Sequence, residues 1–285
     1  MAESRVLVLC ADDFGLAADI DAGILALAAQ GRLTAAGCMA AGPSFAADAG
    51  RLVGLADRID IGLHFALTEL PPLGPVASLG GDGGPHTLGQ VLVRSLTGRI
   101  DYREIAAEIG RQVDRFREIT GRDPDFVDGH QHVHVFPGVR AGLLAAFDAG
   151  VLDARRTWVR TCADRPAAIV SRGIEVPKAL FISALSSGFS AQARARGITV
   201  NDGFRGITAF EPAAFPGLMA KFVTGPGRAP LAMCHPASPD LPAPASDPIA
   251  AARRAEYAHL ASDAFAADLA AAGVRLVRMR EVAAG

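Results

Sequence analysis

The chain has 285 residues, enough for one large α/β barrel or two ordinary domains with a substantial core. Its 28 Lys and Arg nearly balance 30 Asp and Glu, and charge runs are absent from the sequence, which argues against nucleic-acid and anionic-membrane partners. The four cysteines lie far apart without a CxxC pair, so we expect buried free thiols. The first apolar run, residues 6–9, is too short for a signal peptide or a membrane span, which predicts a cytoplasmic protein with no transmembrane segment.

The first predicted strand covers residues 5–11 and ends in two acidic residues, Asp12 and Asp13. Adjacent carboxylates at the end of a buried strand repel each other, and they persist when a cation or a geometric constraint compensates. The alternative is an N-cap for the helix predicted over 19–30, but Asp19 is better placed for that role. We therefore expect a functional role for Asp12 and Asp13.

The next strands and helices lead to a single histidine and a long insertion. We expect a strand over 33–40, a helix over 43–55 and a strand over 59–68 that carries His64 near its end. A lone histidine at such a place is more often a core residue. The position of His64 at the carboxyl end of a strand, like that of the other polar residues, favours a functional role. Residues 70–99 are rich in Pro and Gly, which predicts a loop that covers a substrate or forms a mobile lid.

The stretch 125–138 follows an amphipathic helix and holds three of the seven histidines. In an extended strand, His130, His132 and His134 would share one face with Asp128. Three histidines beside a carboxylate favour a metal or proton-transfer site over a polar strand end. The spacing alone leaves open which of the three binds.

The remaining chain keeps alternating between helix and strand. We expect helices over 139–149, 177–194, 211–223 and 249–272, the last being the longest, and strands over 157–161, 197–200, 228–234 and 274–277. Arg160 near the end of one strand orients a catalytic carboxylate, binds a substrate oxygen or forms a surface ion pair. Asp202 follows another strand, and His235 follows the strand that ends at Cys234.

About seven or eight strands that each precede a helix predict parallel pairing with right-handed crossovers. The simplest such fold is a distorted or incomplete (β/α) barrel of the TIM type, formed by residues 1–285 as a single domain. The polar residues singled out fall at predicted carboxyl ends of strands, where barrel active sites lie: Asp12, Asp13, His64, His130, Arg160 and His235.

The residue types at these positions suit a metal-assisted hydrolase for an amide or ester. One Asp and two His form a ligand set for a divalent ion with open positions. A second Asp can take a proton from water, and a further His can protonate a leaving group. The sequence holds no GxSxG motif, so a nucleophilic serine of that type is not expected.

Four segments together resemble one family over essentially the whole chain. They are Ala11-Asp12-Asp13-Phe14-Gly15, Gly62-Leu63-His64-Phe65-Ala66-Leu67-Thr68, Asp128-Gly129-His130-Gln131-His132-Val133-His134 with Pro137, and Cys234-His235-Pro236. On these segments the chain resembles the YdjC-like carbohydrate deacetylases, which are relatives of the polysaccharide deacetylases. It departs from the commoner Leu-Thr-x-Gly-x-Pro motif of the family. The corresponding residues here are Leu67-Thr68-Glu69-Leu70-Pro71, at the start of the predicted substrate loop.

The resemblance implies a distorted barrel that removes N-acetyl groups from an amino sugar with one divalent metal ion, Zn²⁺ or Mg²⁺. It implies Asp13, His64 and His130 as the metal ligands, Asp12 as the general base and His235 as the general acid. We expect Arg160, His132 and Asp202 on the substrate side, and the resemblance gives His134 no role.

Several alternatives stay open at this point. The substrate is an N-acetylglucosamine-containing oligosaccharide or a glycolipid, the latter in a hopanoid-associated branch of the family. The alternative functions are those of a metal-dependent phosphoesterase or amidohydrolase, or of a sugar- or lipid-binding relative without catalytic activity. The sequence does not fix the oligomeric state, for which a homodimer is one option.

Overall fold

The computed structural model describes residues 5–80 and 83–283, which form one sheet of eight strands. The strands are β1 Arg5–Phe14, β2 Ala35–Cys38, β3 Asp60–Phe65, β4 Phe126–Gly129, β5 Trp158–Val159, β6 Phe204–Arg205, β7 Leu231–Cys234 and β8 Val274–Leu276. Their order is β5-β4-β3-β2-β1-β7-β6, with β8 paired to the start of β1, and every pair is parallel. The predicted incomplete (β/α) barrel is thereby confirmed.

The two edges of this sheet meet through one irregular segment. Val200 forms a parallel bridge with Val159 in β5, and a few residues later β6 pairs with β7. The predicted strand over 197–200 is therefore reduced to a bridge, because the chain turns at Asn201, whose side chain bonds to the backbone of Thr161. An isolated β-bridge, and not a continuous ladder of backbone hydrogen bonds, joins the two edges here, so the barrel is incomplete.

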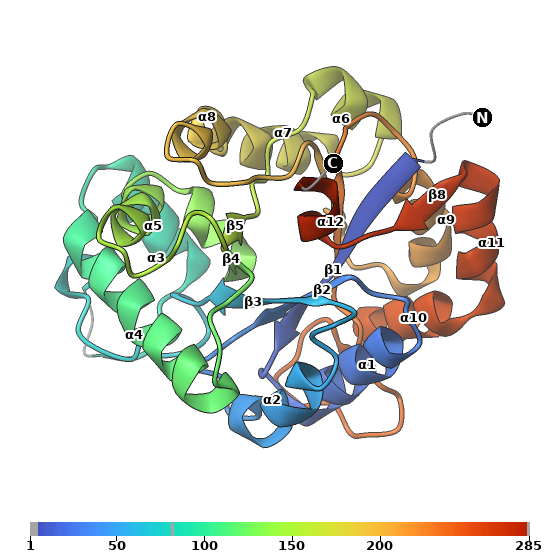
Figure 1. The fold of residues 1–285 in the computed structure, drawn as a ribbon, viewed down its shortest axis with the longest axis horizontal. Coiled ribbons are helices and arrows are strands. Elements are labelled where there is room, and N and C mark those ends of the chain that lie inside the picture. Colours follow the sequence, from blue (N-terminus) through green and yellow to red (C-terminus); the bar gives the residue numbers. More distant parts are fainter. Residues whose placement is uncertain (1–4, 81–82, 284–285) are drawn as a thin grey trace.

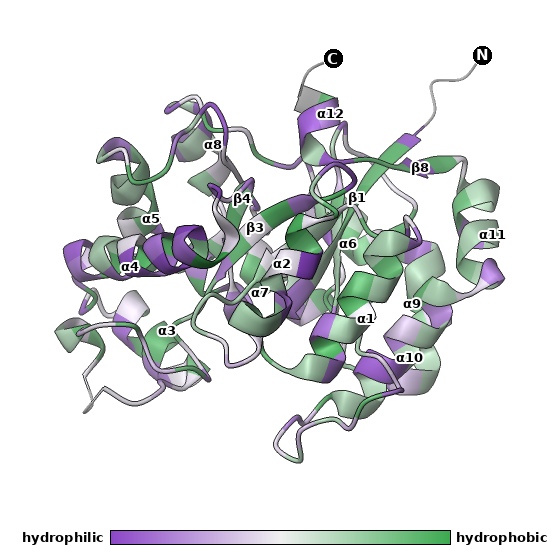
Figure 2. Ribbon diagram, turned by 60° about the horizontal axis from the view of Figure 1, so that its bottom comes forward, coloured by the Kyte–Doolittle hydropathy of each residue, from purple (hydrophilic) through white to green (hydrophobic). Residues whose placement is uncertain are grey.

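Helices surround the curled sheet, as Figure 1 shows. They are α1 Ala18–Ala29, α2 Phe45–Val53, α3 Leu88–Leu96, α4 Tyr102–Thr120, α5 Val139–Asp148, α6 Pro166–Arg172, α7 Val176–Leu185, α8 Phe189–Arg194, α9 Phe215–Phe222, α10 Ala250–Ala261, α11 Asp263–Ala272 and α12 Met279–Ala283, with 3₁₀ turns at Ala77–Leu79, His130–Val135 and Pro212–Ala214. Figure 2 shows hydrophobic strands β1 and β3 in the interior and hydrophilic residues along α4. All four cysteines are buried free thiols, as predicted.

Two helix predictions and one loop prediction need correction. The segment 249–272 breaks at Ser262, whose backbone is extended, so α4 with 19 residues is the longest helix described. The segment 177–194 breaks before Gly188, which has a left-handed φ of 73°. The insertion 70–99 contains α3, because Thr87 and Gln90 form a reciprocal capping box that starts a helix.

The histidine-rich stretch is not a continuous strand, and this prediction was wrong. Strand β4 ends at Gly129, and the chain then forms a tight 3₁₀ turn in which Gln131 and His132 have left-handed φ values of 51° and 61°. The turn folds back onto the strand end, where a Cβ on Gly129 would lie 3.0 Å from the backbone nitrogen of His134. The three histidines therefore point in different directions.

None of the helices in the described ranges combines the length and the apolar character that a membrane span needs.

Candidate metal centre and active site

The parallel sheet gathers the predicted polar residues at its carboxyl end. Asp12 and Asp13 lie near the end of β1, His64 is the penultimate residue of β3, and His130 directly follows β4. His235 directly follows β7. Because parallel strands present their carboxyl ends to the same side of a barrel, residues more than two hundred positions apart become neighbours.

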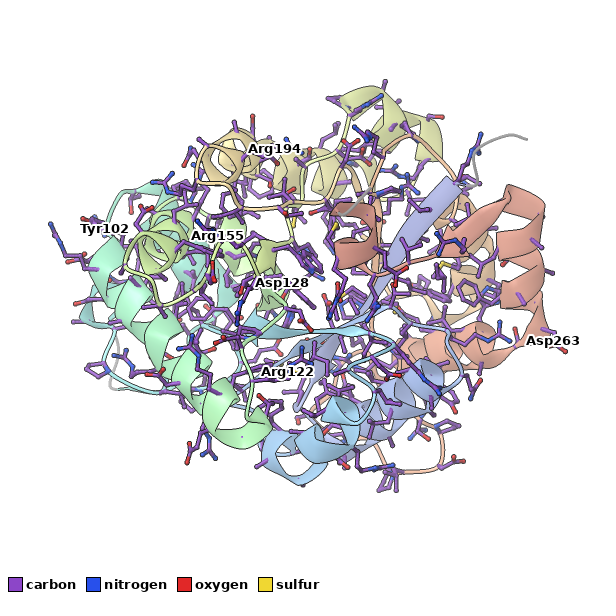
Figure 3. The ribbon with its side chains drawn as sticks, viewed as in Figure 1. Tyr102, Arg122, Asp128, Arg155, Arg194 and Asp263 are labelled. Carbon is purple, nitrogen blue, oxygen red and sulfur yellow. The ribbon has the colours of Figure 1, made fainter. Side chains whose placement is uncertain are left out.

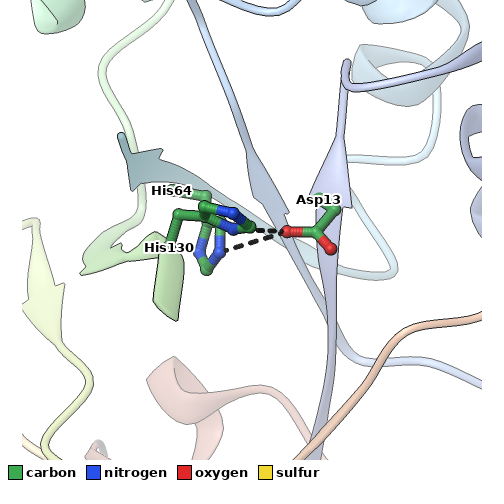
Figure 4. A group of neighbouring side chains, drawn as sticks. All are labelled: Asp13, His64 and His130. Carbon is green, nitrogen blue, oxygen red and sulfur yellow. Dashed lines mark hydrogen bonds and ion pairs between the residues drawn. The ribbon is translucent and has the colours of Figure 1, made fainter. Parts of the chain in front are cut away.

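Asp13, His64 and His130 form a buried candidate metal centre. Oδ1 of Asp13 lies 2.9 Å from Nδ1 of His130 and 3.5 Å from Nε2 of His64, and one ligand atom from each residue lies within 4.8 Å of the others. Figure 4 shows both imidazole rings directed at this carboxylate oxygen. Asp13 has a left-handed φ of 73°, a sparsely populated conformation that accumulates at functional sites. Two imidazole nitrogens and one carboxylate oxygen at this separation fit a divalent ion.

The second ring nitrogen of His64 is held by Asp128. Its Nδ1 lies 2.6 Å from Oδ1 of Asp128, a fully buried residue that Figure 3 shows in the interior, away from peripheral Tyr102 and Asp263. Burial lowers the pKa of His64, but the negative charges of Asp128 and Asp12 outweigh burial and raise the pKa to about 10. A carboxylate on the far nitrogen fixes the ring with Nε2 toward Asp13, as in many metal sites.

The second oxygen of Asp13 is occupied by Arg253 from α10. Nη2 of Arg253 donates to Oδ2 of Asp13 at 2.7 Å, and its Nε donates to Asp247 at 3.0 Å. Burial raises the pKa of Asp13, but the positive charges of Arg253 and His130 hold it well below its usual range. Arg253 therefore keeps Asp13 ionised and leaves Oδ1 as the oxygen that faces the rings.

Asp12 and His235 lie next to the candidate metal centre. Arg160 donates to Oδ1 of Asp12 at 2.7 Å, and Nε2 of His235 lies 4.0 Å from Oδ2 of Asp12. Burial raises the pKa of Asp12, but the charge of Arg160 holds it well below its usual range. Burial lowers the pKa of His235 to about 4. The backbone N–H of His235 donates to the carboxylate of Glu256 at 2.5 Å, which fixes the start of the loop that follows β7.

The other predicted site residues have different surroundings. Arg160 is fully buried and also lies 2.9 Å from Asp128, which excludes a surface ion pair. His132 stacks edge-to-face on Phe204, and Nε2 of His134 lies 2.9 Å from the carbonyl oxygen of Arg160.

Asp202 is not brought to this group. Its backbone N–H donates to the carbonyl of Ala229, which precedes β7, and its carboxylate accepts from the backbone of Arg228. Asp202 therefore lies at the amino end of β7, opposite to His235. The reason is the turn at Asn201, which shifts the following residues from β5 toward the start of β7.

Sequence reasoning missed three residues that contact the site: Glu69, Arg253 and Glu256. Arg253 and Glu256 are three positions apart on α10, so they share one helix face, and a charged pair in an alanine-rich helix is the signal that points to them. Glu69 directly precedes the insertion, and its Oε2 lies 3.0 Å from Nε2 of His130. No local pattern marks Glu69, because its partner lies 61 positions away.

A parallel (β/α) barrel with a buried Asp-His-His cluster at its carboxyl end defines the structural class of this protein. A family model described as YdjC-like protein matches residues 6–271. The chain therefore belongs to the YdjC-like family, and the predicted membership is confirmed.

Named relatives agree with this assignment, and one solved structure shares the fold. A carbohydrate deacetylase from Mus musculus is 38% identical over 146 residues, which cover 49% of this chain and 46% of that protein. A chitooligosaccharide deacetylase from Escherichia fergusonii is 32% identical over 193 residues, covering 64% of this chain and 75% of that one. This chain thus spans less than half the length of the mouse relative. A putative cellobiose-phosphate cleavage protein from Enterococcus faecalis shares the fold, with a TM-score of 0.71 at 20% identity over 98% of this chain and 99% of that chain.

Proposed function

We propose that this protein is a metal-dependent carbohydrate N-deacetylase, which hydrolyses the acetamide of an amino sugar and releases acetate. The observation that carries the proposal is the buried Asp13-His64-His130 cluster, with Asp12 and His235 beside it at the same end of the barrel. The names of the relatives support a carbohydrate substrate, and an N-acetylglucosamine-containing oligosaccharide or glycolipid is the class we propose.

Asp13, His64 and His130 are the residues that would hold one divalent ion. Two imidazole nitrogens favour Zn²⁺, since Mg²⁺ prefers an all-oxygen set, although both ions belong in the test. When bound, such an ion polarises a carbonyl and lowers the pKa of a coordinated water.

The neighbouring side chains supply the proton transfers. Arg160 keeps Asp12 ionised, so its carboxylate can accept a proton from the attacking water. At neutral pH His235 is uncharged, because burial lowers its pKa to about 4, and its Nε2 lies 4.0 Å from Asp12. Because 4.0 Å exceeds a hydrogen-bond distance, a proton taken up by Asp12 would pass to His235, and on to the departing amine, once the two side chains approach each other in the substrate complex. The C–N bond breaks, the acyl carbon gains the hydroxyl, and the amine gains the proton.

The test combines metal analysis with product detection. Purified protein is analysed for bound metal, stripped with a chelator and reloaded with Zn²⁺ or Mg²⁺, and then supplied with N-acetylglucosamine oligomers and with N-acetylated glycolipids. We expect acetate release that disappears on stripping and returns on reloading. Phosphate or ammonia as the product would instead assign another hydrolase class, and substrate binding without acetate would assign a non-catalytic relative.

A further inference from the structure

Each of the three candidate metal ligands has a partner outside the ligand set. Asp128 holds the far nitrogen of His64 at 2.6 Å, and Arg253 holds the second oxygen of Asp13 at 2.7 Å. The far nitrogen of His130, Nε2, faces Oε2 of Glu69 at 3.0 Å. The arrangement repeats one device, in which a charged group fixes the atom that faces away from the ion.

Glu69 differs from the other two partners in exposure. The side chains of Asp128 and Arg253 are 0% and 4% exposed, whereas that of Glu69 is 49% exposed. The backbone of Glu69 has a left-handed φ of 65°, which a residue with a Cβ adopts at a cost. This conformation is held at the boundary between buried Thr68 and the insertion 70–99.

A second contact fixes the carboxylate of Glu69 in place. Its Oε1 accepts from the side-chain amide of Gln131 at 2.6 Å, and Gln131 is the residue directly after His130. Gln131 also has a left-handed φ, so two unusual backbone conformations bring the pair together. Both oxygens of Glu69 are thus directed at the turn that carries His130, which argues against a chance surface contact.

We propose that Glu69 is a positioning residue of the metal centre, which accepts the Nε2–H hydrogen bond of His130 and so holds Nδ1 of this ring toward the ion. The inference rests on the metal site of the proposed function. Nδ1 of His130 can take a metal when Nε2 carries the ring proton, and a carboxylate at 3.0 Å stabilises that tautomer. Because Glu69 directly precedes the insertion 70–99, this hydrogen bond joins the start of the insertion to the metal site.

The experiment measures zinc affinity by competition with a chromogenic chelator, independently of activity. Loss of a carboxylate partner of a ligating histidine typically weakens metal binding about 10- to 100-fold. We expect Glu69→Ala to raise the Kd for Zn²⁺ by about that factor. Glu69→Gln should have a smaller effect, because its amide oxygen still accepts the hydrogen bond without a charge. Glu118→Gln is the matched control, since Glu118 is exposed on α4 and pairs with Arg115.

A second readout distinguishes positioning from general destabilisation. In zinc-loaded protein, the Nε2–H proton of His130 is followed by NMR, and its exchange with water should accelerate in Glu69→Ala while the melting temperature of the metal-free protein stays at the wild-type value. Zinc affinity and proton exchange unchanged in Glu69→Ala would overturn the role of Glu69. If Asp13→Asn also kept wild-type zinc affinity, the metal site itself, and with it the proposed function, would fail.

Discussion

The two ends of the barrel both contain buried charges, but these charges are satisfied differently. At the amino end, Asp60 at the start of β3 accepts from the indole of Trp158, the backbone of Met279 and the guanidinium of Arg280, at 3.1, 3.1 and 2.7 Å. Both of its carboxylate oxygens have partners. This network attaches helix α12 to the sheet.

At the carboxyl end, the network around Asp12 and Asp13 is incomplete. Nη2 of Arg160, Nη1 of Arg253 and Nδ1 of His134 are buried, and none has a hydrogen-bond partner among the residues that the structure describes. Buried polar atoms without partners are costly, so they persist where a ligand or function compensates. Within the described ranges the amino end also has unpartnered buried atoms, Nη1 of Arg122 and Nε of Arg205, but those of Arg160 and Arg253 belong to side chains that contact Asp12 and Asp13.

The strongest test of this difference removes a ligand at the carboxyl end. We expect His64→Ala or His130→Ala to abolish metal content and acetate release together, because each removes one of three donor atoms. Metal analysis and the acetate assay on the same preparation measure both effects. Full metal occupancy in either variant would contradict the ligand assignment.

Removal of the proton-transfer groups should separate metal binding from turnover. Asp12→Asn and His235→Ala leave the three candidate ligands in place, and each should lower kcat by about 10²- to 10⁴-fold. Metal content should stay at the wild-type level. Comparison of kcat and metal occupancy checks the prediction, and a kcat near that of the wild type would assign these residues to structure alone.

Disruption of the amino end should affect stability without affecting the site. Asp60→Ala leaves the buried donors of Trp158 and Met279 unpaired, which should lower the free energy of unfolding by about 1–3 kcal/mol. Urea unfolding measures this loss. The Kd for Zn²⁺ should remain unchanged, and a large increase would show that the two ends are coupled.

The pH dependence of stability tests one buried group beside the site. Burial raises the pKa of Glu256 from 4.5 to about 8. Between these values the unfolded chain releases the proton that the folded protein keeps, so this group makes the free energy of unfolding fall as pH rises. Glu256→Gln cannot titrate, and from pH 7 to pH 8 it should lose about 1 kcal/mol less than the wild type. Urea unfolding at both pH values checks this, and equal losses would show that Glu256 is already ionised.

The smallest expected effect belongs to the second histidine of the turn. His132 packs on Phe204 and lies 3.7 Å from the sulfur of Cys162, and it is not part of the Asp13-His64-His130 cluster. We expect His132→Ala to retain wild-type zinc content, in contrast to His130→Ala. Zinc analysis of the two variants side by side tests which histidine of the stretch serves the metal centre.

Much of the site could be predicted from the sequence because each contribution is local. An apolar run followed by Asp12 and Asp13, or by His235, marks a strand end without reference to the rest of the chain. The alternating pattern of strands and helices then brings those ends together, since parallel strands share one carboxyl side. The helix break at Ser262 and the capping box at Thr87 were missed because they depend on short backbone signals within longer helical or loop-like patterns.

The sequence by itself determined the parallel barrel and the residue types at its carboxyl end, because periodicity and strand-end polarity are properties of short segments. Tertiary structure decided which atoms meet. The turn after Gly129 directs His130 toward Asp13 and His132 toward Phe204, although both occupy equivalent positions in the predicted strand. The partnership between Arg253 and Asp13 joins residues 240 positions apart, and such a contact exists only once the sheet has curled and α10 has packed against it.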